Sequence, residues 1–152
     1  MSFTIIEGDV VVRDADGNAA GVTTDGRLSV STAPNPPTGA TTVSQGYTGN
    51  VSGTDNQFYT IPVGEQLYIQ RFAGGGEFKG DGSKAELYWA PNGTTAGIVL
   101  IRVGYVNGSN FEFNLDYTAP AVGDGTAAIL TRRRRLSGGT KEIAAFWDGF
   151  TQ

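Results

Sequence analysis

Apolar and polar residues alternate with a period of two along much of the chain after residue 41. The alternation is clearest in three sets of residues: Val99, Ile101, Val103 and Tyr105; Phe111, Phe113 and Leu115; and Ile143, Ala145 and Trp147. Because successive side chains of a β-strand point to opposite faces, each set is predicted to line one side of a strand and to enter the core.

Seven strand-like runs follow one another to the C-terminus, and turn residues separate all of them. They are Gln57–Ile61, Gln66–Ala73, Lys84–Ala90, Gly97–Val106, Asn110–Leu115, Thr126–Arg135 and Glu142–Phe150, with Thr41–Ser44 as a candidate eighth. The segment Lys141–Trp147 is also compatible with a helix, but Asp148 and Gly149 would end that helix within two turns, so we predict a strand. This pattern predicts an all-β fold, an antiparallel two-sheet sandwich with jelly-roll topology. Alternation alone does not distinguish a jelly roll from an immunoglobulin-like strand order.

The first 30 residues show a different pattern, in which short β-rich runs flank tight turns. Val10–Arg13 and Arg27–Val30 enclose the turn signals Asp16-Gly17-Asn18 and Asp25-Gly26, which indicates an extended β-hairpin arm. Isolated hairpins are marginally stable in water, so this arm needs a surface to pack on. We expect it to dock on a partner through its apolar and basic strand residues, Val10, Val11, Val12, Arg13, Leu28 and Val30.

A proline-rich segment separates this arm from the rest. Residues 31–41 contain three prolines and no large apolar residue, a composition typical of a semi-rigid linker. The predicted organisation is therefore a docking arm (1–31), a Pro-rich linker (32–41) and a jelly-roll β-sandwich domain (42–152).

The amino-acid composition excludes several classes of function. The chain has no Cys and no His, which excludes disulfides, thiolate and imidazole metal ligands, and nucleophilic catalysis that depends on either residue. No apolar run approaches the roughly 20 residues that span a bilayer, and the N-terminus lacks a basic region followed by an apolar stretch. We therefore expect a non-enzymatic binding or assembly protein, made in the cytoplasm, with no cofactor and no membrane contact.

Charge departs from the general pattern at one place, the run Arg132, Arg133, Arg134 and Arg135. These four residues are among only eleven bases in a chain of net charge −4. A nucleic-acid binder normally spreads basic residues over a whole face, so we expect no nucleic-acid partner. If the run continues a strand, alternate arginines face opposite sides. We expect the run to pair with carboxylates of the same chain, another subunit or a different protein, and favour an intersubunit contact.

Two further motifs have a functional reading and a structural one. Residues Asp14–Asn18 begin like an EF-hand calcium loop, but Gly17 comes before the position where the loop needs Gly, and Asp25 stands where the loop needs Glu. A hairpin turn explains the same residues, so we predict no metal. The second motif is a set of aromatic residues that could form a carbohydrate-binding platform, although alternation turns both tryptophans inward. The set comprises Tyr59, Tyr68, Tyr88, Trp89 and Trp147.

Several segments, taken together, resemble structural proteins of tailed bacteriophage virions that carry a jelly-roll domain. They are VVVRDADGNAAGVTTDGRLSV, FYTIPVGEQLYIQRFAGGGEF, ELYWAPNG, VLIRVGY and GDGTAAILTRRRRLSGGTKEIAAFWDGF. The resemblance implies a virion component without enzymatic activity, a capsid decoration or tail-associated accessory protein that contacts other virion proteins. It also implies a homo-oligomer, for which we expect a trimer. The alternative is a tail or fibre module that recognises carbohydrate on the host surface.

Overall fold

The computed structural model describes residues 12–13, 19–22, 28–29, 36–77, 82–106 and 108–152, and the chain divides into two units, Met1–Pro34 and Asn35–Gln152. In the first unit, strands β1 (Val12–Arg13), β2 (Ala19–Val22) and β3 (Leu28–Ser29) form an antiparallel sheet in that order. The expected docking residues Val10, Val11 and Val30 lie outside the described residues, as does the Asp14–Asn18 motif. The described ranges contain no helix that is long and apolar enough to cross a membrane.

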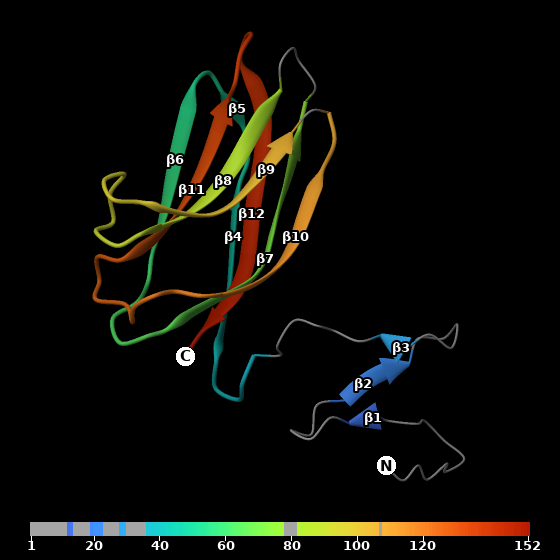
Figure 1. Ribbon diagram of the computed structural model, residues 1–152, viewed down its shortest axis with the longest axis vertical. Coiled ribbons are helices and arrows are strands. Elements are labelled where there is room, and N and C mark those ends of the chain that lie inside the picture. Colours follow the sequence, from blue (N-terminus) through green and yellow to red (C-terminus); the bar gives the residue numbers. More distant parts are fainter. Residues whose placement is uncertain (1–11, 14–18, 23–27, 30–35, 78–81, 107) are drawn as a thin grey trace. The chain divides into compact units, whose positions relative to one another are not determined.

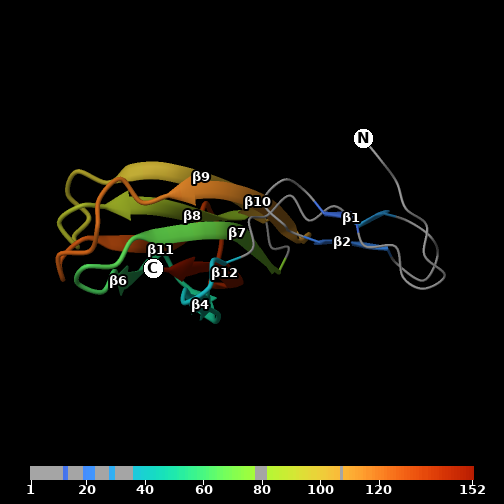
Figure 2. The same cartoon turned by 90° about the horizontal axis from the view of Figure 1, so that it is seen from below.

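The second unit consists of two antiparallel sheets packed face to face (Figures 1 and 2). One sheet has the order β10 (Phe111–Thr118), β7 (Leu67–Gly76), β12 (Lys141–Thr151) and β4 (Thr41–Tyr47), with β5 (Asn50–Val51) paired to the start of β12. The other has the order β6 (Thr54–Thr60), β11 (Ala128–Arg135), β8 (Ser83–Ala90) and β9 (Val99–Val106). The predicted all-β sandwich is confirmed.

These two strand orders are those of a jelly roll. The chain passes from one sheet to the other at nearly every connection, and among the described strands of this unit β8 and β9 are the only consecutive pair that are also neighbours in a sheet. Interleaved Greek-key connections of this kind define the jelly roll, whereas an immunoglobulin domain joins its strands in a different order. Lys141–Trp147 is part of the long strand β12, as predicted.

The core lies between the sheets and is centred on β12. Ile143, Ala145 and Trp147 are fully buried, so the predicted inward face of this strand is confirmed. The ring of Trp147 meets that of Tyr59 from the opposite sheet edge to face, with centroids 5.3 Å apart. Trp89 is also buried. Both tryptophans therefore pack inside the domain.

The inward face predicted for the strand at 97–106 is wrong for Val103 and Tyr105. Val99 pairs with the inward Trp89 but is 58% exposed, so it does not enter the core as predicted. The register between β8 and β9 shifts, so that Leu87 pairs with Arg102 and the next residue, Tyr88, pairs with Leu100. This bulge leaves Ile101 packed against the core but turns Val103 and Tyr105 to the outer face, where Tyr105 is 64% exposed. A single inserted residue reverses the alternation on which the prediction depended.

Phe111 and Phe113 face the core as predicted, but they are only partly buried. They belong to β10, an outermost strand of its sheet, and fewer neighbours cover them than cover the central strand β12. Gly104 on β9 makes room for the ring of Phe111, because a Cβ at this position would overlap that ring. The core is thus deepest around Trp147 and shallower near the edge formed by β9 and β10.

This difference in depth predicts different costs for two truncations. Trp147→Ala should lower the free energy of unfolding by about 3–5 kcal/mol, because it leaves a cavity that the sheets cannot close. Phe113→Ala should cost about 1–2 kcal/mol, because its site is already partly open to water. Chemical denaturation of the two variants and the wild type measures both values, and equal costs would contradict the assigned depth.

Burial also shifts the pKa of Tyr117 in this domain. It raises the pKa of the inward-facing Tyr117 phenol to about 12 from an ordinary 10.0. Since the folded state favours the neutral phenol, this group's contribution to stability should be complete below pH 10 and lost as the pH rises through about 12. Phenolate absorbance of the wild type should contain this late component, and Tyr117→Phe should remove it.

Candidate functional site

The four arginines at the end of β11 lie in four different environments. Arg133 points inward and is 6% exposed. Its Nη2 lies 2.6 Å from Asp55 Oδ2 on β6, its Nε donates to the same oxygen, and its Nη1 donates to the carbonyl of Ile143 on β12 at 2.7 Å. One guanidinium therefore joins both sheets. Its partners come from the same chain, so Arg133 is not available to another subunit.

Arg132 and Arg135 are partly occupied by their own chain. Arg132 Nε donates to Asn56 Oδ1 at 2.8 Å, and its guanidinium lies over the ring of Tyr88 on the outer face of the second sheet. Arg135 donates to the backbone carbonyl of Gly138 in the following turn. The predicted alternation holds, because Arg132 and Arg134 share the outer face with Leu130, whereas Arg133 shares the inner face with Ile129.

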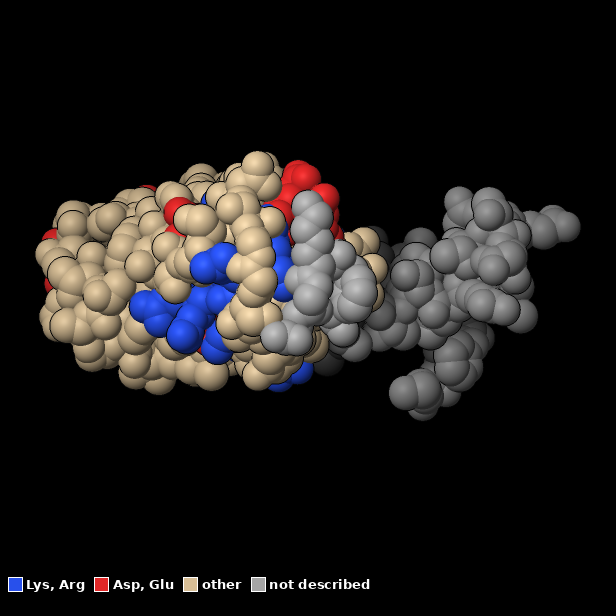
Figure 3. Space-filling model, turned by 90° about the horizontal axis from the view of Figure 1, so that it is seen from above, with Lys and Arg blue, Asp and Glu red and all other residues tan. Residues whose placement is uncertain are grey.

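Arg134 is the one exposed arginine of the run, and no partner for its side chain is found among the described residues. Its cross-strand neighbour on β8 is Lys84. Lys84 Nζ lies 2.6 Å from Oε1 of the buried Glu86, whose other oxygen, Oε2, accepts no hydrogen bond within the described structure. Seen from above, the basic side chains gather at this end of the sandwich (Figure 3).

A groove of about 740 Å³ opens on the outer face of the first sheet. Its floor consists of small residues where β7 and β12 pair, including Ala73, Gly75 and Ala144. Glu112 on β10 and Glu142 on β12 stand on either side of this floor, and the volume lies within the range of typical ligand pockets. Sequence analysis missed the groove because glycines are poor strand formers, so the predicted strand ended at Ala73, before Gly74–Gly76.

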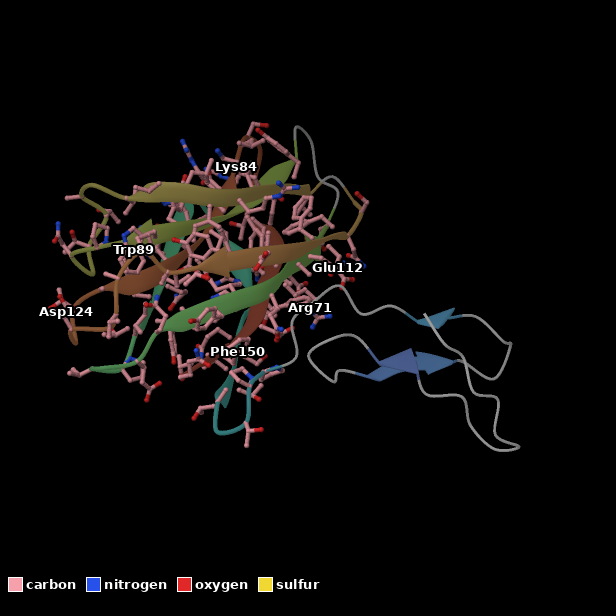
Figure 4. The ribbon with its side chains drawn as sticks, turned by 60° about the horizontal axis from the view of Figure 1, so that its bottom comes forward. Arg71, Lys84, Trp89, Glu112, Asp124 and Phe150 are labelled. Carbon is pink, nitrogen blue, oxygen red and sulfur yellow. The ribbon has the colours of Figure 1, made fainter. Side chains whose placement is uncertain are left out.

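A row of polar contacts crosses the sheet next to the groove. Arg71 Nε donates to Asp148 Oδ2 at 2.7 Å, Arg71 Nη1 lies 3.4 Å from Glu112 Oε1, and Ser44 Oγ donates to Asp148 Oδ1. The guanidinium of Arg71 also lies 5.5 Å from the ring centre of Phe146. Figure 4 shows Arg71 and Glu112 on adjacent strands. The hydrogen bond to Asp148 raises the pKa of Arg71, so this guanidinium stays charged.

Asp124 lies in a loop at a distance from the groove (Figure 4). The backbone N–H groups of Ala127 and Thr126 donate to its Oδ1 and hold the pKa of this exposed carboxyl below its usual value. This arrangement is a local turn rather than an acid–base pair. Across the described ranges, no group of three or more acidic residues could hold a metal ion.

The aromatic residues considered as a carbohydrate platform do not lie on one surface. Trp89, Trp147 and Tyr59 pack in the core. Tyr88 lies under the guanidinium of Arg132. Tyr68 stacks on Phe150, with ring centres 4.8 Å apart, on the outer face of the other sheet. The set therefore provides no continuous stacking surface.

Comparison with known proteins does not identify a family for this chain. The sequence matches no protein-family model, and no curated protein is significantly similar to it.

The environments of Arg133 and Arg134 predict opposite effects of truncation. Arg133→Ala should destabilise the fold by about 3–5 kcal/mol, because Asp55 and the carbonyl of Ile143 both lose their cationic partner. Arg134→Ala should change stability by no more than about 0.5 kcal/mol. Urea denaturation of dilute protein measures both. A negligible effect of Arg133→Ala would mean that the contact between the sheets does not stabilise them.

Proposed function

We propose that this chain is a non-enzymatic structural component of a bacteriophage virion, a decoration or accessory protein. Its N-terminal arm, residues 1–31, docks on a capsid or tail protein, and its jelly-roll domain is displayed from that anchor. The functional molecule is a homo-oligomer, for which a trimer is the expected state. The observation that carries the proposal is the combination of a small N-terminal β unit with a jelly-roll domain in one chain.

The physical argument starts from what each unit can do alone. The three strands of the first unit have only two to four residues each, and short sheets of this kind gain stability by pairing with another sheet. The jelly roll, by contrast, has its own core around Trp147. Jelly rolls occur in viral capsid proteins and in lectins, so the fold is compatible with a virion component. The resemblance in the strand sequences favours the virion.

The lectin-like alternative is a tail or fibre module that binds host carbohydrate. The structure disfavours this alternative, because the aromatic residues are dispersed. They lie in the core, under the guanidinium of Arg132 and in the Tyr68–Phe150 stack. Two large aromatic side chains, Tyr105 and Phe58, are exposed on the described second sheet, and Tyr105 is the more exposed of them at 64%. Specific binding of the intact protein to a glycan array, lost in Tyr105→Ala, would favour this alternative over the decoration role.

Deletion of the arm tests the proposed division of labour. The full chain should co-sediment with assembled phage shells or tails, whereas a variant that begins at residue 35 should fold and lose most of that binding. The reason is that docking depends on backbone pairing by the arm, while the core of the second unit does not include it.

Circular dichroism and denaturation of the deletion variant provide the control for folding. If the truncated protein unfolds, the arm is part of the folding unit. If it folds and still binds the particles as the full chain does, docking belongs to the jelly roll instead.

A further inference from the structure

Two surfaces of the jelly-roll domain have opposite charge and are both left incomplete by their own chain. One is the end of β11 and β8, where Arg134 lies opposite Lys84. The other is the groove between Glu112 and Glu142. We propose that Arg134 of one copy binds in this groove of a second copy, so that the protein self-associates through two different surfaces. The inference rests on the proposed function in that it identifies contacts for the expected homo-oligomer.

The position of Arg134 favours an external anionic partner. Like charges directly opposite each other on neighbouring strands destabilise a sheet, and Arg134 faces Lys84 in this way. Lys84 is held by Glu86, but Arg134 forms no ion pair with a carboxylate among the described residues. A carboxylate supplied from outside would relieve this repulsion. The other three arginines are occupied to different degrees, so Arg134 is the member of the run best placed for an intersubunit ion pair.

The groove has a shape and a chemistry that suit an arginine side chain. Its floor lacks large side chains, so an extended side chain can lie along it. Glu112 and Glu142 are exposed at its two sides, and guanidinium groups form the most favourable charged hydrogen bonds with carboxylates. Phe146 adds an aromatic wall, which already accepts one guanidinium, that of Arg71.

A second copy is the occupant that charge complementarity favours, because the same chain supplies both complementary surfaces. They lie on the outer faces of different sheets, so their contact is heterologous rather than a symmetric patch meeting itself. Such contacts close into a ring when the rotation between copies permits, which is compatible with the expected trimer. Tyr105, the cross-strand neighbour of Lys84 on β9, is exposed and would be covered on association.

A charge swap in the full chain tests the contact. Arg134→Glu and, separately, Glu142→Arg should each weaken self-association by at least about tenfold, because each places like charges together. The double variant that carries both changes restores an opposite pair and should regain much of the association, whatever the symmetry. Sedimentation equilibrium between about 0.05 and 0.5 M salt measures the association constants, and the wild-type constant should fall as salt rises.

Two matched controls separate this contact from a general charge effect. Arg102→Glu changes the net charge as Arg134→Glu does, on a residue that lies over Phe113. Asp116→Arg changes it in the opposite direction, at an exposed position of β10 outside the groove. Both controls should associate like the wild type.

The proposal is overturned if the wild type is monomeric, if either single variant associates normally, or if the double variant fails to recover. Co-sedimentation of the same variants with phage particles distinguishes failure of this contact between copies from failure of the proposed virion role. Loss of particle binding by Arg134→Glu with unchanged self-association would assign Arg134 to a virion protein and refute the contact between copies. Absence of particle binding by every form, with the swap pattern intact, would refute the virion role and retain the contact.

Discussion

The packing of two sheets around Trp147 is the constraint on which the remaining structure depends. The chain has no disulfide and its described part has no helix, so each sheet can shield its apolar face only against the other. Strand β12 lies within the first sheet, between β7 and β4, and it carries Trp147 to the ring of Tyr59 in the second. Arg133 reinforces the same junction by binding Asp55 on one sheet and the carbonyl of Ile143 on the other.

Because the inner faces of both sheets are packed together, the surfaces available for binding are the outer faces and the ends of the strands. Because the core uses Arg133 and Arg134 is the exposed member of the run, the proposed contact between copies depends on Arg134 and not on all four arginines. On the opposite sheet, the glycine-rich end of β7 omits side chains and thereby creates the groove. A row of polar contacts from Glu112 through Arg71 and Asp148 to Ser44 crosses four strands beside this groove. The contact with Arg71 holds the Glu112 carboxylate at the side of the groove.

The proposed docking arm and the proposed contact between copies rest on different physical interactions. Strand addition by the arm would depend on backbone hydrogen bonds, which are largely insensitive to side-chain charge. Pairing of Arg134 with a groove would depend on charge and would weaken with salt. A virion protein that uses both can attach to a particle and associate with its own copies independently.

The sequence alone determined the fold class, because a period of two in β12 and β10 indicates strands whatever their partners. It also indicated that the tryptophans point inward. Tertiary structure decided the face of Val103 and Tyr105, since the bulge in β9 arises from pairing with β8 and leaves no signal in the alternation. Tertiary structure also decided that Arg133 pairs within its own chain. Asp55 lies 78 residues away in the sequence, and only the pairing of β6 with β11 brings the two together. The groove depends on pairing in the same way, because glycines predict no strand until neighbouring strands hold them in one.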